Sequence, residues 1–342
     1  MATPERTQPT LAEIAKACAV STSTVSRALK DSPKLPEATR RRIQAVAADL
    51  GYAPNYSLSR VMSEIRSRKK QAYRETLGYI TADPIRYESR IYQGVCRRAE
   101  ELGYNIDRFV LGNPAKEVSA LGRMLGARGV RGLVVAPFGQ AYSTLQLNWS
   151  RHAAVAIGDS LAEPDLHRVA RDVVHMLRLV FARLEKRGYR RIGFLIDRSQ
   201  EERMDYNTLA GVLVHDWHQS QDFRVAPLIA EKLTAERIVD WYRRERPDLI
   251  FTMDHLVCDW LEAAGHFVPG DVGVFLFNCY TPDSSISGIY PAYESMGMAA
   301  VEQVSGLLDR GEFGYPEGSR RLLVPGQWCE GRTIRPLAGK KT

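Results

Sequence analysis

The stretch from residue 10 to residue 55 reads TLAEIAKACAVSTSTVSRALKDSPKLPEATRRRIQAVAADLGYAPN, and it contains three short runs with the apolar spacing of helices. The first run begins at Thr10 with Glu13 three residues later, which is the pattern of a capping box. Its expected inward face consists of Leu11, Ile14, Ala15 and Cys18. This spacing predicts the first helix of a small helical domain.

A tight turn at Ala19-Val20 and a second helix follow. Ser21 can cap this helix, because a serine side chain accepts a hydrogen bond from the open N–H groups of a first turn. Val25 and Leu29 are expected to face inward. The expected outward face holds Thr22, Ser23, Ser26 and Arg27. Two short helices joined in this way form a helix-turn-helix pattern.

A third helix is expected from about Pro36 to Leu50, ended by Gly51, with three arginines near its start. Its expected inward residues are Ile43, Val46, Ala47 and Leu50. Three helices around one core leave the second helix outside, short, polar and carrying one arginine, which suits entry into a DNA major groove. A helical bundle that docks on another partner is the alternative.

The distribution of charge also favours a polyanion partner. The chain of 342 residues has a net charge of +7. Residues 1–75 hold 14 Lys and Arg against 7 Asp and Glu, whereas the remainder holds 33 of each. Basic side chains that neutralise phosphates release condensed counterions, which drives binding to nucleic acid. From charge alone, a solvated basic tail is the alternative.

Composition bounds the class of protein. Hydrophobic residues are 44% and charged residues 25% of the chain, which is typical of a globular protein, and the length suits two domains plus a small module. The N-terminus has no apolar core of a signal peptide, and no stretch reaches the roughly 18 apolar residues of a membrane span. We therefore expect a cytoplasmic protein without a membrane partner. Five scattered cysteines without metal-ligand spacing favour reduced thiols, and no metal or cofactor is expected.

The body, residues 76–342, alternates short apolar runs with helical segments. Strands are expected at 76–82, 105–111, 132–137, 153–158, 190–196, 224–230, 248–254, 271–277 and near 321–328. Helices are expected at 92–104, 119–129, near 171–188, through Trp217, up to Arg246, up to Gly265 and near 293–310. The alternation predicts two doubly wound α/β subdomains in series. Because such sheets bind ligands at the carboxyl ends of their strands, two facing subdomains would form a ligand cleft.

No catalytic apparatus stands out. The chain lacks the glycine patterns of dinucleotide-binding and P-loop proteins, and its seven histidines have no ligand-spaced partners. A sugar-metabolising enzyme with a fused DNA-binding head remains the alternative function, although its phosphate-binding glycines are missing. An exported sugar-binding protein would share the body but would need a signal peptide and no basic head.

The 10–55 stretch resembles the DNA-binding head of the LacI/GalR family of bacterial transcription regulators, through the spacing of AVS, TVSRAL, EATRRRI and LGYAPN. The resemblance implies that Thr22, Ser23 and Arg27 read base edges, with Arg27 able to make a bidentate contact to guanine. The residues expected to hold phosphates are Ser21, Thr24, Ser26, Lys30, Tyr52 and Asn55. Lys30 stands where an asparagine is frequent in the family. Its side chain either contacts a phosphate or is simply solvated.

Besides Lys30, two further positions in the head depart from the family pattern. Ala19 holds the turn position usually occupied by glycine, which costs about 1 kcal/mol if the backbone there has a positive φ. Pro36 stands where a serine usually caps the third helix. The head is still expected to fold, with a slightly different turn.

The connector, residues 54–75, contains the run YSLSRVMSEIRSRKKQAYRE. One face of a short helix would hold Leu58, Val61, Met62 and Ile65. In the family this segment is a hinge helix whose apolar wedge, usually leucine, enters the minor groove and kinks the operator. The wedge position is then Val61, with Met62 adjacent. The basic run that follows serves either as a linker or as extra phosphate contacts, and it resembles a divergent branch of the family with a long basic hinge.

The body resembles the periplasmic-binding-protein-like core of the same regulators, through RRIGFLI, RPDLIFTMD, DVGVF and SISGIYPAYESMGMAAVEQVSGLLDRG. The implied organisation is a head at 1–53, a hinge and linker at 54–75 and a core at 76–342. Its two subdomains would span about 76–160 and 161–280, each completed by part of 280–342. The implied function is a homodimeric regulator, by family default a repressor, that binds a double-stranded operator and whose affinity is set by a small effector.

Effector-binding candidates come from strand ends and from family motif positions. They are Asp83, Phe138, Asp159, Asp172, Arg203, Asp254, Asn278 and Tyr280. Carboxylates beside aromatic faces suit hydroxyl-rich ligands, so a carbohydrate is expected, although each residue alone could be a cap or a packing residue. Thr208 stands where the family usually has an arginine, with Arg203 upstream as a substitute. Asn278 stands where the family usually has an aspartate, so the effector's identity is not carried over.

Overall fold

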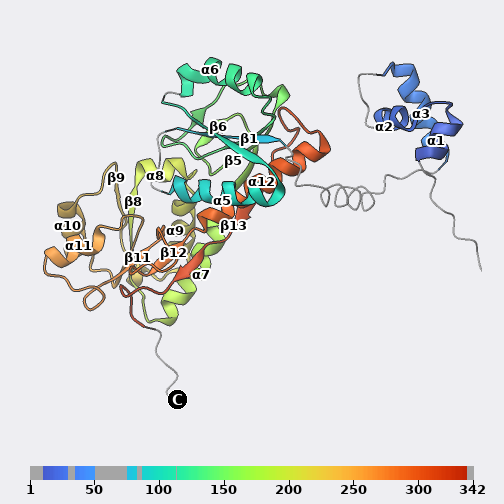
Figure 1. Cartoon of the computed structure of the whole chain (residues 1–342). Coiled ribbons are helices and arrows are strands. Elements are labelled where there is room, and N and C mark those ends of the chain that lie inside the picture. Colours follow the sequence, from blue (N-terminus) through green and yellow to red (C-terminus); the bar gives the residue numbers. More distant parts are fainter. Residues whose placement is uncertain (1–10, 30–34, 51–74, 83–86, 113, 337–342) are drawn as a thin grey trace, which may run out of the picture. The chain divides into compact units, whose positions relative to one another are not determined.

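The computed structural model describes residues 11–29, 35–50, 75–82, 87–112 and 114–336 of the chain (Figure 1). The chain divides into two compact units, Met1–Ala72 and Tyr73–Thr342, which are the head and the body below. Several residues singled out from the sequence lie outside the described residues, namely Thr10, Lys30, Tyr52, Asn55, Val61, Met62 and Asp83.

The head is built from three helices around one small core. The helices are α1 Leu11–Ala17, α2 Thr22–Leu29 and α3 Glu37–Asp49. The buried core consists of Ile14, Ala15, Cys18, Val25, Ala28, Ile43 and Ala47. The predicted helix-turn-helix pattern and most of its inward residues are therefore confirmed. The expectation for Leu50 was wrong: its side chain is 44% exposed, because α3 ends at Asp49 and Leu50 is the C-cap residue.

The turn between α1 and α2 contains a strained residue. Ala19 has φ +51°, in the left-handed region, and its N–H donates to the carbonyl oxygen of Lys16 at 3.3 Å. A side chain with a Cβ atom is unfavourable in this conformation. The positive φ that the family's usual glycine implied is therefore present here with alanine.

The first sheet of the body is parallel throughout, in the order β13-β7-β5-β3-β1-β2. Its strands are β1 Thr76–Thr81, β2 Asn105–Val110, β3 Gly132–Val135, β5 Ala153–Ile157, β7 His167–Arg171 and β13 Arg321–Val324. The central strands β1, β3 and β5 are almost continuous runs of buried residues, which suits a sheet covered on both faces. A short pair, β4 Ser143–Thr144 and β6 Leu161–Glu163, lies beside it.

The second sheet has the order β14-β12-β11-β10-β8-β9. Its strands are β8 Ile192–Asp197, β9 Leu228–Ala230, β10 Leu249–Thr252, β11 Gly273–Leu276, β12 Gly288–Tyr290 and β14 Gln327–Cys329. All neighbours are parallel except β14, which runs antiparallel to β12. The predicted fold class, two doubly wound α/β subdomains after a helical head, is confirmed.

Helices cover both sheets (Figure 1). They are α5 Glu88–Leu102, α6 Pro114–Ala127, α7 Val173–Lys186, α8 Arg198–Arg203, α9 Asn207–His218, α10 Ala235–Glu245, α11 Val257–Ala263 and α12 Tyr293–Arg310, with short 3-10 turns at Trp149–Arg151 and Gln221–Phe223. Helix α12 returns from the second sheet to pack beside α5 on the first (Figure 1). The approach is close, because a Cβ atom at Gly297 would lie 2.2 Å from the carbonyl oxygen of Ile91.

Several predicted strands have different bounds. The single strand expected near 321–328 is two strands, β13 in the first sheet and β14 in the second. Strand β9 begins at Leu228 and not at 224, because Pro227 has no N–H for the ladder. Strand β7 was missed, and its place in the first sheet puts the crossing to the second subdomain after Arg171, later than the expected position near 160.

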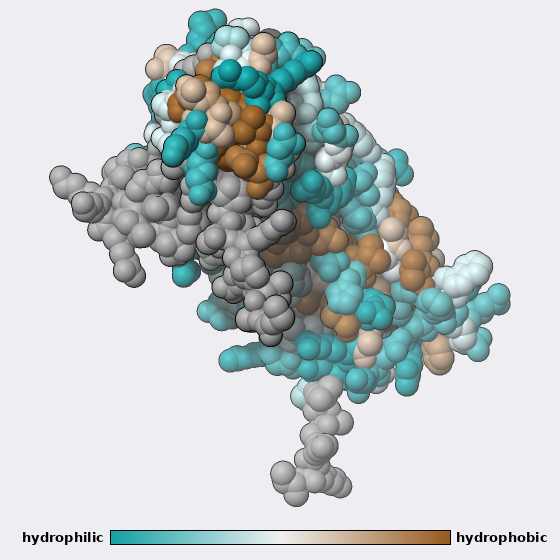
Figure 2. All heavy atoms as spheres, turned by 90° about the vertical axis from the view of Figure 1, so that its right-hand side faces the viewer, coloured by the Kyte–Doolittle hydropathy of each residue, from teal (hydrophilic) through white to brown (hydrophobic). Residues whose placement is uncertain are grey.

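Hydrophilic residues cover most of the face drawn in Figure 2, with hydrophobic residues gathered in separate patches. The large hydrophobic side chains with the greatest exposure in the body are Trp217, Phe267 and Tyr315. Within the described residues, every helix is too short or too polar to span a bilayer.

Candidate DNA-binding head and ligand cleft

Helix α2 is the polar helix of the head. Val25 and Ala28 are buried against the other two helices, whereas the Thr22 and Arg27 side chains are exposed. The N–H of Thr24 donates to Ser21 Oγ at 3.2 Å, and the two hydroxyl oxygens lie 2.8 Å apart. Ser21 therefore caps α2, as predicted. Thr22 and Arg27 thus lie on the exposed side of α2, whose opposite side packs in the core of the head.

Polar side chains of α3 hold the ends of α1 and α2. Arg42 Nη2 donates to the carbonyl oxygen of Cys18 at 3.3 Å, and Gln44 Nε2 donates to that of Ala28 at 3.0 Å. Carbonyl groups at helix C-termini have no partner inside the helix, so these bonds satisfy groups that would otherwise be open. Arg41 pairs with Glu37 within α3. The arginine-rich third helix thus fixes the orientation of α2.

The cleft of the body consists of two adjoining spaces. A chamber of about 420 Å³ lies at the carboxyl ends of β8 and β10. Its lining includes Phe194, Glu201, Lys232, Phe251, Asp254 and Trp260. A channel of about 80 Å³ runs between the two subdomains. Its lining includes Tyr87, Asp159, Arg171, Arg203, Asn278 and Tyr293. Gln200 and Met253 line both spaces, so the chamber and the channel lie next to one another.

Four of the predicted effector residues line the cleft. Asp159, Arg203 and Asn278 line the channel, and Asp254 lines the chamber. Their positions follow from the parallel sheets, whose strand ends all meet at the same edge. The sequence therefore brought together residues from three loops and one helix that are far apart along the chain.

The other described candidates lie elsewhere. Phe138 is 2% exposed in the core of the first subdomain, and its N–H donates to Ser160 Oγ at 2.8 Å. Asp172 precedes α7, and its N–H donates to the carbonyl oxygen of Val324 at 3.1 Å. The Tyr280 ring lies under the Arg90 guanidinium at 4.8 Å. None of these three belongs to the described lining of the chamber or the channel.

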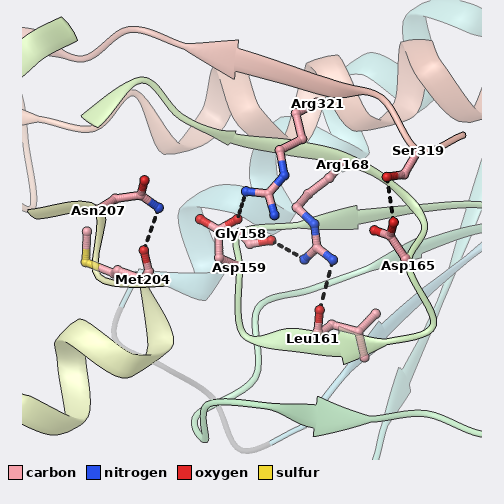
Figure 3. A network of polar contacts seen from close by, with 9 residues as sticks. All are labelled: Gly158, Asp159, Leu161, Asp165, Arg168, Met204, Asn207, Ser319 and Arg321. Carbon is pink, nitrogen blue, oxygen red and sulfur yellow. Dashed lines mark hydrogen bonds and ion pairs between the residues drawn. The ribbon is translucent and has the colours of Figure 1, made fainter. Parts of the chain in front are cut away.

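Asp159 belongs to an arginine network at the edge of the channel (Figure 3). Its Oδ1 pairs with Arg321 Nη1 at 3.0 Å, and its side chain is 12% exposed. Burial raises the pKa of Asp159, while Arg321 and Arg168 oppose that shift. Arg168 itself donates to the carbonyl oxygens of Gly158 at 2.7 Å and Leu161 at 2.9 Å. The charge of Asp159 is therefore already balanced by protein cations.

Two arginines reach across the channel. Arg171, at the end of β7, donates from Nη2 to the carbonyl oxygen of Phe277 at 2.8 Å, and its guanidinium lies 4.9 Å from the centre of the Phe277 ring. Arg203, at the end of α8, donates from Nη2 to the Tyr87 hydroxyl at 2.6 Å. The Tyr87 ring stacks on Tyr293 with centres 4.8 Å apart. Each arginine thus joins one subdomain to the other.

Sequence reasoning missed Arg171. The strand that carries it, β7, reads HRVAR and was not predicted because two arginines interrupt its apolar residues. Arg168 is nevertheless buried, with loop carbonyls as acceptors. Arg171 could have been found from its place in the sequence, because it directly precedes Asp172, the aspartate of the family's V-x-x-D pattern.

The chamber combines carboxylates with aromatic faces. Glu201 is buried, accepts a hydrogen bond from the N–H of Leu209 at 2.9 Å, and has its pKa raised by burial. Asp254 accepts from the N–H of Leu256 at 2.9 Å. The rings of Phe194, Phe251 and Trp260 supply apolar walls. Such a lining suits a small ligand with hydroxyl groups.

Two family models match separate parts of the chain. Residues 10–55 match the model of bacterial regulatory proteins of the lacI family. Residues 181–334 match the model of a periplasmic binding protein-like domain. The first match covers the head, and the second covers most of the second subdomain together with α12 and the C-terminal strands.

Curated relatives carry the same kind of name. An HTH-type transcriptional regulator of Mycobacterium tuberculosis is 30% identical over 208 residues, which are 59% of this chain and 55% of that protein. The HTH-type transcriptional regulator PtxS of Pseudomonas plecoglossicida is 32% identical over 194 residues, which are 55% of this chain and 53% of that protein. The chain spans about half the length of these relatives. They are named as transcription regulators and not as enzymes.

Solved structures share the fold over nearly the whole chain. The lac repressor dimer bound to operator and the anti-inducer ONPF matches with a TM-score of 0.57 and 18% identity, covering 96% of this chain and 100% of that one. The transcriptional regulator CelR in complex with cellobiose matches with a TM-score of 0.55 and 19% identity, covering 95% and 100%. At these identities the likeness establishes the fold.

Proposed function

The chain belongs to the lacI family of bacterial regulatory proteins, and from this premise we propose that it is a sequence-specific transcription regulator whose affinity for its operator is controlled by a small effector in the cleft of the body. The observation that carries the proposal is the exposure of Thr22 and Arg27 on the capped helix α2. In this proposal α2 enters the major groove, and Thr22, Ser23 and Arg27 read base edges.

The remaining head residues position the helix and bend the DNA. Phosphate contacts come from Ser21, Thr24, Ser26, Lys30, Tyr52 and Asn55, which fix orientation but carry no sequence information. Val61, with Met62 beside it, supplies the minor-groove wedge of the hinge. A homodimer presents two heads to two half-sites of a pseudo-palindromic operator. Repression is the family default and is part of the proposal.

The effector side of the proposal rests on the chamber. A carbohydrate is the proposed ligand, because the chamber places the Asp254 and Glu201 carboxylates beside three aromatic rings. The channel residues Asp159, Arg203 and Asn278 are proposed to contact the same ligand from the other side. An effector that binds one arrangement of the subdomains more tightly shifts the protein toward it, and with it the affinity for DNA.

Arg27→Ala tests the DNA-binding part of the proposal. Loss of one bidentate contact costs about 1–3 kcal/mol, so operator affinity is expected to fall roughly 5- to 150-fold. Arg41→Ala is the matched control, because it removes the same charge from an exposed arginine of α3 that pairs with Glu37. We expect the operator affinity of the control to stay within about threefold of that of the unmodified protein, since loss of one peripheral charge changes only the electrostatic part of binding.

The measurement is a gel shift over a salt series on the DNA upstream of the protein's own gene, with random-sequence competitor. The proposal predicts a specific band whose affinity falls steeply with salt. Absence of any sequence-specific band in every ligand condition would falsify DNA regulation as the function. Equal losses in the two variants would remove Arg27 as a base-reading residue.

A further inference from the structure

The channel holds two guanidinium groups that lack carboxylate partners among the described residues. Arg171 donates to a backbone carbonyl and Arg203 to a tyrosine hydroxyl, both of them neutral acceptors. The Nε atoms of both arginines are buried and have no hydrogen-bond acceptor in the described part of the chain. The Asn278 Oδ1 atom beside them is likewise buried and accepts no hydrogen bond there.

Neither arginine forms an ion pair with a carboxylate of the described residues, and the charges of Glu201 and Asp159 act on Arg171 only from a distance. Asp159 is the acidic residue in the described lining of the channel, and it is paired with Arg321. Arg168 adds a further buried cation close to Asp159. The channel therefore carries an excess of positive charge, whereas the chamber next to it holds the carboxylates of Asp197, Glu201 and Asp254 against Lys232.

An uncompensated buried charge is costly, and the cost falls when an anion arrives. Taking a guanidinium out of water costs several kcal/mol unless an opposite charge or hydrogen bonds compensate for it. Arginine is also the residue that best recognises planar or tetrahedral oxyanions, because its donors form a fork that matches carboxylate and phosphate oxygens. Two such groups at one narrow opening therefore favour a negatively charged ligand group over a neutral one.

We infer that the effector is a hydroxyl-bearing anion, whose carboxylate or phosphate group binds Arg171 and Arg203 in the channel while its hydroxyl-bearing body occupies the chamber. The inference rests on the proposed function and narrows its effector from carbohydrates in general to acidic or phosphorylated ones. The shared Gln200 and Met253 place the two binding regions next to one another, as one ligand requires.

The same geometry connects the anionic group to the relation between the subdomains. Arg171 comes from the first sheet and contacts Phe277, which follows strand β11 of the second. Arg203 comes from the second subdomain and contacts Tyr87, which precedes α5 of the first. An anion bound by both arginines thus contacts groups that hold the subdomains together, so its binding is coupled to their arrangement.

The test uses the full chain and isothermal titration calorimetry with matched probes. The first set of probes is D-glucose, D-gluconate and D-glucose 6-phosphate, which share a carbon skeleton and differ in the acidic group. The second set is D-galactose, D-galactonate and D-galactose 6-phosphate. Acetate and inorganic phosphate carry the anionic group alone, so they test the arginines independently of sugar stereochemistry. We expect at least one anionic probe to bind 10-fold or more tightly than its neutral counterpart. A preference for the carboxylates or for the phosphates distinguishes the two sources.

Arg171→Gln and Arg203→Gln identify the site. Each is expected to weaken the anionic probe at least 10-fold and to abolish its advantage over the neutral sugar. Arg198→Gln is the matched control, because Arg198 is an exposed arginine of the same helix α8, pairs with Glu231 and is absent from the described lining. If Arg171→Gln fails to fold by circular dichroism, Arg203→Gln still decides the question, since Arg203 is only half-buried.

Three outcomes would overturn the inference. These are equal binding of neutral and anionic probes, failure of every anionic probe to bind, and anion binding that survives both arginine substitutions. The gel shift without ligand separates this failure from failure of the proposed function. A protein that binds its operator specifically but prefers a neutral sugar is a regulator whose effector class we assigned wrongly.

Discussion

At the scale of the residue, the backbone conformation of Ala19 lowers the stability of the head. Its φ of +51° is a conformation that costs a residue with a Cβ atom about 1–2 kcal/mol. The adjacent hydrogen bond from Val20 N–H to the carbonyl oxygen of Ala15, at 3.0 Å, holds the turn in place. The head tolerates the strain because α3 secures both neighbouring helices through Arg42 and Gln44.

Ala19→Gly is therefore expected to stabilise the head. Relief of about 1–2 kcal/mol exceeds the roughly 0.4–1 kcal/mol by which glycine enlarges the entropy of the unfolded chain. A net gain of about 1 kcal/mol slows hydrogen exchange at the buried amides of Val25 and Ala28 about fivefold. Ala48→Gly is the control, because this exposed residue of α3 has helical geometry and loses about 1 kcal/mol. Faster exchange in Ala19→Gly would contradict the strain.

A buried histidine makes the stability of the body depend on pH. His215 stacks on Phe181 with ring centres 4.0 Å apart, and burial lowers its pKa from 6.5 to about 4. Between those two values the unfolded chain binds the proton more readily than the folded one, so this stability is present above pH 6.5 and is lost as pH falls toward 4. The contribution lost between pH 7 and pH 5 is about 2 kcal/mol.

Urea unfolding at pH 7 and pH 5 checks this expectation. The loss of stability on acidification should be smaller by about 2 kcal/mol in His215→Leu than in the unmodified protein. His218→Leu, on the exposed side of the same helix α9, should keep most of the loss, because burial is the larger cause of the lowered His215 pKa and the charge of His218 the smaller one. Identical pH dependence in the two variants would show that burial of His215 does not shift its protonation.

At the scale of the element, the crossing of α5 and α12 depends on two glycines. A Cβ atom at Gly94 would lie 2.0 Å from the carbonyl oxygen of Glu294, and one at Gly297 would lie 2.2 Å from that of Ile91. Both neighbours are backbone atoms of the facing helix, so they cannot rotate away as a side chain could. The two helices reach this distance only because neither carries a side chain at the contact.

Gly297→Ala is expected to destabilise the body by about 3 kcal/mol, because the two helices must separate to admit the methyl group. Gly306→Ala on the same helix is the control. Its Cβ atom would meet only the flexible end of Arg310, at 3.0 Å, and alanine is the better helix former by about 1 kcal/mol. Urea unfolding followed by tryptophan fluorescence should give opposite signs for the two variants. If Gly306→Ala were also destabilised, the loss of stability in Gly297→Ala could not be assigned to the crossing of α5 and α12.

At the scale of the whole molecule, the head and the body have separate hydrophobic cores. The head core is formed by α1, α2 and α3, and the clusters of the body are formed by its two sheets and their helices. We expect two calorimetric unfolding transitions, since each unit buries its own apolar surface. Ala19→Gly should move only the head transition and Gly297→Ala only the body transition. A single transition moved by both variants would show that the units unfold together.

Hydrophobic periodicity carried most of the fold prediction. It identified the three head helices, the central strands of both sheets and helix α12, because their apolar residues recur with the period of the element. It failed at β7, where Arg168 is buried within a strand, and at β12, which has only three residues. Both strands lie between two neighbours in their sheets, and a window of sequence does not contain the neighbours that define such short strands.

The sequence by itself determined the fold class, the head motif and the strand ends from which the site is built, since each follows from local pattern and from resemblance. Only the tertiary structure decided which candidates meet. Asp159, Arg203 and Asn278 line one channel, whereas Phe138 is buried in a core. Arg171 also lines the channel, and it comes from a strand that the sequence did not predict. The reason is physical, because the charge balance of a buried group depends on partners such as Arg321 and Asp159 that lie far apart along the chain.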